Sequence, residues 1–406
     1  MVINTGLANL NRYNLNFIII FFYYAAIYGT IAVFEENMMI RSIKDIILLV
    51  ISFITLFIII FKKQQKDLFV LFVLFLFYIP IIIIPYMFLN LSEQSLLYGL
   101  KITILPIVML FTGILLSNFI KKDKILNCFK GIFFIITATW LIQYFLGIEK
   151  LLNFGYEYGI NVKHFYGYLR LPSTIGTPDG YAILLAFLSI IIERNIKNKK
   201  IKILFFIVSM VFILSSTIRS AIMYWLVAYI TLFFLRVLTS RTKFIIYSSL
   251  LLIFVPIFLF IMSKVNNSLF SIHSLEDRLS HWNLIEFDPF STKGIIGSGL
   301  GSVGASSVKL EEINRSLNGY AVDNQFLAIY YQIGILGIII FLLIIFYILY
   351  VFFKKRSKGQ LGIIIIIGTI VSCLFTNTLE IYPYNLYFWF YLGILIDEPE
   401  LIETEY

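Results

Sequence analysis

Three arginines stand out because apolar or loop sequence surrounds each of them. Arg170 lies in YGYLRLPSTIGTPDGY, Arg219 in LSSTIRSAIMYW and Arg278 in SLEDRLSHWNLIEF. A guanidinium keeps its charge in proteins and presents a planar fork of N–H donors that fits phosphate oxygens. These residues therefore predict a site that binds a phosphate or diphosphate group.

The apolar sequence around Arg219 predicts a tight hairpin between two membrane-spanning helices. Residues 202–238 are almost entirely apolar, and an arginine at the bilayer centre would cost about 2.5 to 3.5 kcal/mol on insertion scales. A structural role, in which Arg219 snorkels to the interface or binds helix-end carbonyls, stays open. A structural role also stays open for Arg170, which precedes Pro172 and a turn at 176–180.

The sequence around Arg278 predicts a short helix on the membrane surface. Leu275, Leu279 and Trp282 share one face at helical spacing, and tryptophan favours the level of the lipid headgroups. His281 lies beside Trp282 on this segment. A purely structural interfacial helix is the alternative.

A glycine-rich stretch and an acidic residue follow in the same polar interval. GLGSVG at 299–304 has the spacing G-x-G-x-x-G, but no strand–turn–helix unit surrounds it, so a dinucleotide site is not predicted. The N–H groups of Gly299 and Gly301 could bind an anionic headgroup, with a flexible loop as the alternative. Asp323 precedes an apolar helix, where it could cap that helix or accept a hydroxyl proton.

The composition predicts an all-α polytopic membrane protein that positions these residues. Of 406 residues, 60% are hydrophobic and 14% are charged, against about 25% charged in soluble domains. A span needs about 20 apolar residues, and we expect about 12 transmembrane helices. The predicted spans are 14–33, 43–61, 68–89, 100–120, 129–148, 179–192, 202–217, 220–238, 244–262, 325–352, 361–380 and 384–396.

Basic residues fill every second gap between these spans. They are Lys62, Lys63, Lys66; Lys121, Lys122, Lys124, Lys130; Arg194, Lys197, Lys199, Lys200, Lys202; Arg236, Arg241, Lys243; and Lys354, Lys355, Arg356, Lys358. The positive-inside rule makes that side, and both termini, cytoplasmic. The net charge of +9 therefore reflects topology and gives no argument for nucleic acid as a partner.

This topology divides the chain into transmembrane and outer parts. Residues 1–262 would hold nine spans with a smaller outer loop at 149–178, and residues 263–324 would form a large outer loop with short interfacial helices. Residues 325–396 would hold the last spans, before an acidic cytoplasmic tail at 397–406. The first apolar run should remain as an uncleaved signal anchor. Neither the two cysteines nor the three histidines have metal-ligand spacing, so we predict no metal and no cofactor.

Three motifs in order resemble the bacterial O-antigen ligase/polymerase superfamily. The turn SSTIRSA at 215–221 is similar to the family's S-x-S-R-[GS]-[AS]. Arg278-x-x-x-Trp282 with DPFSTKGIIGSGLGSVG at 288–304 is similar to its outer loop, and VDNQFLAIYYQIGILG at 322–337 to its re-entry helix. The resemblance covers about residues 200–345, and the rest only in hydropathy.

This resemblance implies an inverting, metal-independent glycosyl transfer at the outer face of the bacterial cytoplasmic membrane. The donor would be a saccharide on undecaprenyl diphosphate, and the acceptor a second such glycolipid. Arg219 and Arg278, with Arg170, would hold the diphosphate, while Trp282, His281, Asn324, Gly299 and Gly301 would contact substrate. The family's ligases have a histidine where this chain has Asp323, which favours a polymerase of O-antigen or capsule repeat units.

Three alternatives stay open. An O-antigen ligase would transfer glycan to a lipid A-core acceptor, and a flippase or solute transporter would carry ionisable groups on broken helices at the membrane midplane. A structural or sensory membrane protein is the third. For a polymerase, a chain-length regulator and a flippase are the expected protein partners, together with membrane lipid.

Overall fold

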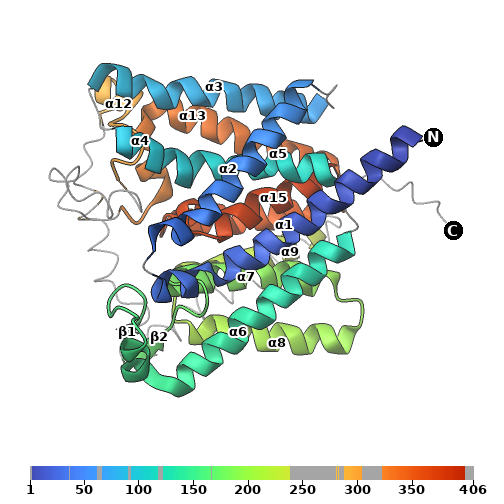
Figure 1. Ribbon diagram of the computed structural model, residues 1–406, viewed down its shortest axis with the longest axis vertical. Coiled ribbons are helices and arrows are strands. Elements are labelled where there is room, and N and C mark those ends of the chain that lie inside the picture. The colour runs from blue at the N-terminus through green and yellow to red at the C-terminus, as the bar shows by residue number, and fades with distance from the viewer. Residues whose placement is uncertain are drawn as a thin grey trace.

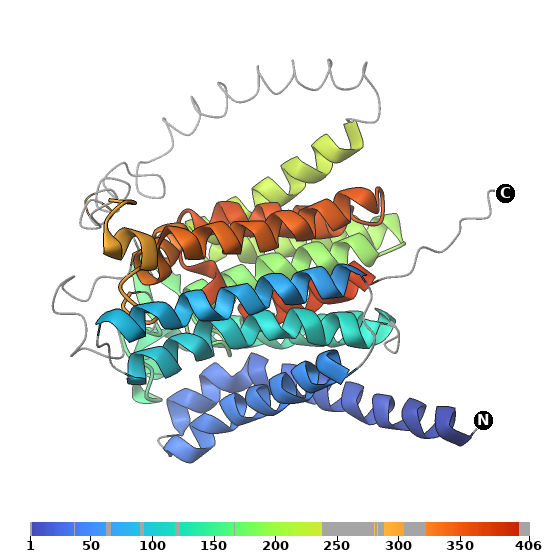
Figure 2. The ribbon, with the colours of Figure 1, turned by 90° about the horizontal axis from the view of Figure 1, so that it is seen from above.

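The computed structural model describes residues 2–35, 37–61, 66–89, 93–117, 122–165, 167–237, 280, 282, 288–303 and 322–397. The described part is a bundle of helices that lie roughly along one another (Figures 1 and 2). The helices are α1 (Val2–Phe34), α2 (Met38–Phe61), α3 (Lys66–Leu89), α4 (Glu93–Gly99), η1 (Leu100–Ile104), α5 (Leu105–Ser117), α6 (Lys122–Asn153), α7 (Pro178–Asn195), α8 (Lys199–Ser215), α9 (Arg219–Val237), α12 (Thr292–Ile296), α13 (Gln325–Lys354), α14 (Gln360–Cys373), η3 (Thr378–Glu380) and α15 (Tyr384–Asp397). A small antiparallel ribbon pairs β1 (Lys163–Phe165) with β2 (Tyr168–Arg170).

The structure supports a multi-pass membrane protein but not twelve long spans. Among the described residues, six helical stretches are long and apolar enough to cross a membrane: Asn16–Phe34, Met39–Phe61, Lys66–Leu89, Glu93–Ser117, Lys122–Asn153 and Gln325–Lys354. Helices α14 and α15 have 14 residues each, or about 21 Å, against a hydrocarbon core of about 30 Å. The predicted span at 244–262 lies outside the described residues.

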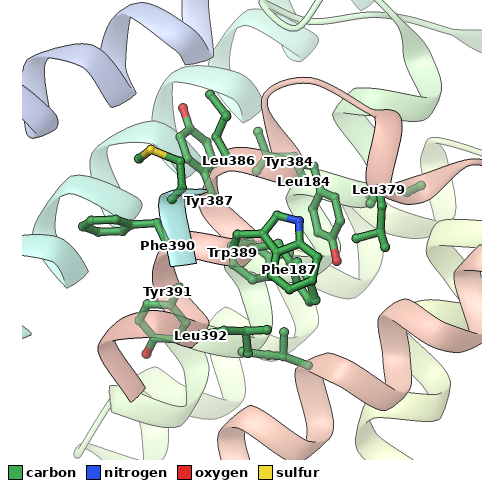
Figure 3. Close-up of a cluster of buried hydrophobic side chains, with 14 of the residues drawn as sticks. Leu184, Phe187, Leu379, Tyr384, Leu386, Tyr387, Trp389, Phe390, Tyr391 and Leu392 are labelled. Carbon is green, nitrogen blue, oxygen red and sulfur yellow. The ribbon is translucent and has the colours of Figure 1, made fainter. Parts of the chain in front are cut away.

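Helix α15 is almost entirely apolar, and other helices surround it. Its residues from Tyr384 to Ile396 are all buried, and Figure 3 shows their aromatic rings packed with Phe187 and Leu184 of α7. The Tyr387 hydroxyl donates to the Phe22 carbonyl of α1 at 2.6 Å. Helices α5 and α15 meet at two glycines, where a Cβ on Gly393 would lie 2.0 Å from the Leu110 carbonyl oxygen. Burial in the core therefore accounts for the apolar sequence of α15, a short helix that need not face lipid.

The described parts of the two predicted outer segments lie at the same end of the bundle. Figure 1 shows β1, β2, α4 and α12 together at the left, whereas α1 begins and α15 ends at the right. At that right-hand end, Ser117 donates to Asp397 at 2.5 Å, and the Lys355 ammonium donates to the Leu395 carbonyl at 3.2 Å. We call the end with β1, β2 and α12 the outer end. That this end faces away from the cytoplasm stays a prediction.

Candidate functional site

Arg170 and Arg219 meet around one aromatic ring at the outer end. The Arg170 Cζ lies 3.8 Å from the centroid of the Phe165 ring, and the Arg219 Cζ lies 5.5 Å from the same centroid. Phe165 is the last residue of β1 and Arg170 is the last residue of β2. The hairpin therefore places both residues against the turn between α8 and α9. The face of an aromatic ring attracts cations, which makes Phe165 a platform for two positive charges. We call Phe165, Arg170 and Arg219 the arginine pair site.

The turn before α9 fixes the position of Arg170. The Arg170 Nε donates to the Thr217 Oγ1 at 3.1 Å, and its Nη2 donates to the Thr217 carbonyl at 2.9 Å. Thr217 has a φ of 54°, an uncommon conformation for a residue with a Cβ. Arg219 is the first residue of α9, where the helix dipole already carries partial positive charge. Two guanidiniums and a helix N-terminus therefore create an environment that favours an anion.

A buried loop behind β2 holds the hairpin rigidly. Residues 171–176 are buried, and Ser173 is bound on both backbone sides by Gln143: its N–H donates to Oε1 at 2.8 Å, and its carbonyl accepts from Nε2 at 3.0 Å. The Thr174 hydroxyl donates to the Ala26 carbonyl of α1 at 2.6 Å. The stretch after Arg170 is therefore largely structural, and it ties α1, α6 and α7 beneath the arginine pair site.

Asn324, rather than Asp323, caps α13. The Asn324 Oδ1 accepts from the Phe326 N–H at 3.0 Å and the Leu327 N–H at 3.2 Å, and the residue is only 7% exposed. The capping alternative considered for Asp323 therefore belongs to its neighbour. Asp323 lies one residue outside the helix and is partly exposed. As a whole residue, Asp323 is therefore more exposed than Asn324.

Glu380 is a buried carboxylate at this end that the sequence reasoning missed. It is 6% exposed, and its Oε1 accepts from the Gln325 Nε2 at 3.3 Å. The Gln325 Oε1 accepts from the Leu379 N–H at 3.1 Å, so the first turn of α13 and η3 are joined twice. The available signal was a lone acidic residue in the otherwise uncharged stretch TNTLEIYPY.

Three consecutive residues, Glu380 to Tyr382, connect different elements of the outer end. Glu380 binds Gln325 of α13, and the Cγ2 of Ile381 would lie 3.4 Å from a Cβ on Gly180, in the first turn of α7. The Tyr382 ring centroid lies 4.2 Å from the Lys44 Nζ of α2. We call this segment the connecting segment. It links the loop that carries Arg170 to the start of α13.

The glycine-rich turn is packed into the bundle. The Gly299 N–H donates to the Gln332 carbonyl at 2.9 Å, and the Gly301 N–H donates to the Gln332 Oε1 at 2.8 Å. Both glycines are buried. These two N–H groups already have acceptors within the protein, so we do not include them in the proposed site.

Trp282 packs against apolar residues next to Asp323 and belongs to a different cluster from the arginine pair site. Its ring lies against the cluster of Val303, Val322, Ala328 and Tyr330, and its buried Nε1 has no hydrogen-bond partner among the described residues. Arg278 and His281 lie outside the described residues. Of the predicted site residues, the structure brings Arg170 and Arg219 into one cluster. It places Trp282 beside Val322, the residue before Asp323.

Comparisons with known proteins give no match to this chain. No protein-family model matches the chain, and no curated protein matches its sequence. Within the described ranges, no group of three or more His, Cys, Asp or Glu could hold a metal ion. Function therefore has to be argued from the residues at the outer end.

Proposed function

We propose that this protein is a polymerase of polysaccharide repeat units, carried as glycolipids on undecaprenyl diphosphate in the bacterial cytoplasmic membrane. The observation that carries the proposal is the arginine pair site, where two guanidiniums share the Phe165 ring beside the N-terminus of α9. The order of motifs in the sequence supports the same reaction class. Arg278 joins the site on the sequence argument alone.

The proposed reaction is an inverting transfer. An acceptor hydroxyl attacks the anomeric carbon of the donor saccharide, a carboxylate takes the hydroxyl proton, and the bond from that carbon to the carrier phosphate breaks. The electron pair of that bond leaves with the diphosphate, which gains negative charge. Fixed guanidiniums that meet this charge stabilise the transition state without reorganising, as oxyanion-hole donors do.

The position of the buried charges favours a surface site over transport. Among the residues whose burial the structure describes, Glu193 and Glu380 are the buried acidic or basic side chains, and each lies near the end of a helix. Glu193 lies in the last turn of α7, and its Oε1 pairs with the Lys202 Nζ at 3.3 Å. A transporter is expected to carry such groups on broken helices at the midplane. A ligase remains the second candidate, and Asp323 in place of the ligases' histidine disfavours it.

Reconstitution tests the proposed function directly. The purified protein in liposomes with a lipid-linked repeat unit should produce a ladder of glycolipids with two or more repeats. Products that retain a single repeat, with the protein folded and the substrate accessible, would contradict a polymerase. Transfer only to an added lipid A-core acceptor would identify a ligase.

The carboxylate that takes the proton is expected to be Asp323. Replacement Asp323→Asn should lower the transfer rate at least about 100-fold, because general base catalysis contributes about 100- to 10,000-fold and an amide cannot accept the proton. Glu380→Gln is the matched control: its carboxylate is buried against Gln325, so we expect a lower Tm and a transfer rate within about 10-fold of the unmodified protein. Full activity of Asp323→Asn would reduce Asp323 to the residue before a helix cap.

Chelation should leave the reaction intact. The guanidiniums are proposed to do what a divalent cation does in other glycosyl transfers, so EDTA should change the initial rate less than about 2-fold. The measurement is the rate of ladder formation in proteoliposomes with and without EDTA. A strict requirement for Mg²⁺, restored by adding the ion back, would contradict the proposed role of the arginines.

A further inference from the structure

The loop between α6 and β1 is apolar on its outward side as well as on its inward side. Its inward side packs into the core through three buried residues, Leu151, Tyr156 and Val162. Its outward side has three apolar or aromatic residues that are 52%, 58% and 58% exposed, Phe154, Tyr158 and Ile160. We call Phe154, Tyr158 and Ile160 the outer apolar residues. Exposed apolar groups of this kind mark surfaces that contact a protein or a membrane.

Hydrogen bonds fix the conformation of this loop. The Asn161 N–H donates to the Glu157 carbonyl at 2.9 Å, and the Glu157 N–H donates to the Asn161 Oδ1 at 2.9 Å. The Asn161 Nδ2 donates to the Gly176 carbonyl at 2.8 Å, and the Tyr156 hydroxyl accepts from the Gln143 Nε2 of α6 at 3.2 Å. The loop therefore holds a defined position relative to α6 and to the buried loop behind β2.

The length of α6 places this loop at the membrane surface. Residues 131–148 contain no charged side chain and would extend about 27 Å as a helix, against a hydrocarbon core of about 30 Å. The next two residues, Glu149 and Lys150, are charged and exposed. Gly147 interrupts the helix with a φ of 77°, so the chain can leave the direction of the span at this depth. The loop therefore begins where the hydrocarbon core ends.

The loop also follows directly on an apolar part of α6 that other helices do not cover. Phe134, Ile142 and Phe145 of α6 are mostly exposed, and such side chains on a membrane-spanning helix face lipid. Aromatic residues are enriched where a span leaves the hydrocarbon, since a ring suits the apolar side and a hydroxyl the wet side. Phe154 and Tyr158 have this position in the sequence. A bilayer surface therefore matches the loop in depth and in residue type.

The charges of the loop indicate which kind of lipid surface it would contact. Its charged residues from 149 to 163 are two acidic and two basic ones, Glu149, Glu157, Lys150 and Lys163, and none of them is buried. Attraction to anionic lipids needs a cluster of basic residues near the surface. Because the two signs balance here, apolar contact accounts for binding and a zwitterionic surface is sufficient.

We propose that the outer apolar residues insert into the surface layer of the lipid bilayer, in the leaflet at the outer end. This contact holds the β1–β2 ribbon, and with it Arg170, at the level of the lipid headgroups, because Asn161 ties the loop to Gly176 behind β2. Figure 1 shows the end of α6 at the same end of the bundle as the ribbon. The inference concerns the position of the loop in the membrane and does not depend on the proposed function.

Depth measurements with spin labels test the proposal. The native cysteines, Cys128 and Cys373, are both buried and are replaced by alanine, and single cysteines are introduced by Phe154→Cys, Tyr158→Cys or Ile160→Cys. Each labelled full-length protein is placed in phosphatidylcholine vesicles. Electron paramagnetic resonance then measures collisions of the label with oxygen, which concentrates in hydrocarbon, and with a water-soluble nickel chelate. The labels should lie within about 5 to 10 Å of the boundary between headgroups and acyl chains.

Two further positions calibrate the measurement. Phe134→Cys, in the uncharged part of α6, should report hydrocarbon, and Lys197→Cys, exposed between α7 and α8, should report water. The Tm of every labelled variant is compared with that of the cysteine-free protein. Leu152→Cys, at a residue that is 38% exposed, replaces any of the three positions whose variant has a lowered Tm.

The collision rates distinguish lipid from water and from protein. Two or more of the three labels at the expected depth support the proposal, and fewer overturn it. Labels as accessible to the nickel chelate as the label at position 197 would show a loop in water. Low collision rates with both reagents would show contact with a second copy of the chain. Adding phosphatidylglycerol should leave the depth unchanged, and insertion only in its presence would overturn the apolar contact. The labels report depth without substrate, so a protein that forms no ladders leaves this result unaffected.

Discussion

Ladder formation should fall at least about 100-fold when Arg170 and Arg219 are both replaced by alanine, because the proposed function assigns these two residues as donors to the departing diphosphate. Removing one oxyanion-hole donor in other enzymes costs about 100- to 1,000-fold. Both guanidiniums lie on the Phe165 ring, so the remaining residues of this cluster cannot supply the missing charge. The measurement is the initial rate of glycosidic bond formation in proteoliposomes. Single-repeat glycolipid should accumulate.

Two controls separate lost chemistry from lost structure. Arg170 also binds Thr217, so Arg170→Lys and Arg219→Lys test whether charge without the planar fork is enough; we expect partial activity. Arg356→Ala removes an arginine from the α13–α14 turn at the opposite end and should leave the ladder unchanged. Arg278→Ala, predicted from sequence alone, should behave like the double variant. Normal ladders in the double variant with normal Tm would end the diphosphate assignment.

The second large effect is expected at Gly334, where α13 is interrupted. Gly334 has a φ of 68° and a ψ of −171°, a combination that only glycine adopts readily. A Cβ there would lie 2.1 Å from the Ile295 carbonyl oxygen and 2.8 Å from the Gly297 nitrogen. Gly334→Ala should therefore combine backbone strain of about 1 to 3 kcal/mol with a clash of about 1 to 3 kcal/mol. We expect a lower Tm in detergent and loss of ladder formation, because α12 can no longer pack on α13.

Gly147→Ala isolates the clash from the strain. Gly147 interrupts α6 with a similar φ of 77° and ψ of 164°, but a Cβ there would meet nothing within 4 Å. It should lower Tm by clearly less than Gly334→Ala and should keep the ladder. Equal shifts in Tm would mean that the contact between α12 and α13 contributes nothing beyond the backbone conformation.

The helices were predictable from the sequence, whereas the number of helices long enough to span a membrane was not. The predicted apolar runs coincide with α1, α2, α3, α5, α6, α7, α8, α9, α13, α14 and α15, because long apolar runs have few alternatives to a helix in a membrane. Hydropathy cannot distinguish a span that faces lipid from a helix that other helices surround. Helix α15 shows this, since its residues from Tyr384 to Ile396 are apolar except Asn385 and are all buried by neighbouring helices.

The candidate site was only half visible in the sequence. Residue type and apolar surroundings identified Arg170 and Arg219, but their meeting depends on Phe165 and on the β-hairpin, which the spacing did not reveal. Glu380 and Lys44 were missed because each becomes notable through residues distant in the chain, Gln325 for one and Tyr382 for the other. Both residues are placed by contacts between distant parts of the chain, and a hydropathy pattern does not predict such contacts.

The most direct test of the central claim combines a change in the carrier phosphate of the substrate with the replacement of two arginines in the protein. The donor saccharide is supplied on undecaprenyl diphosphate or on undecaprenyl monophosphate, and transfer rates are compared for the unmodified protein and for Arg170→Ala with Arg219→Ala. Coupled groups show non-additive effects in such a cycle. If the arginines hold the carrier diphosphate, losing one phosphate should cost the unmodified protein at least about 100-fold and the variant less than about 10-fold. The same factor in both proteins would contradict the claim that these two arginines bind the leaving group.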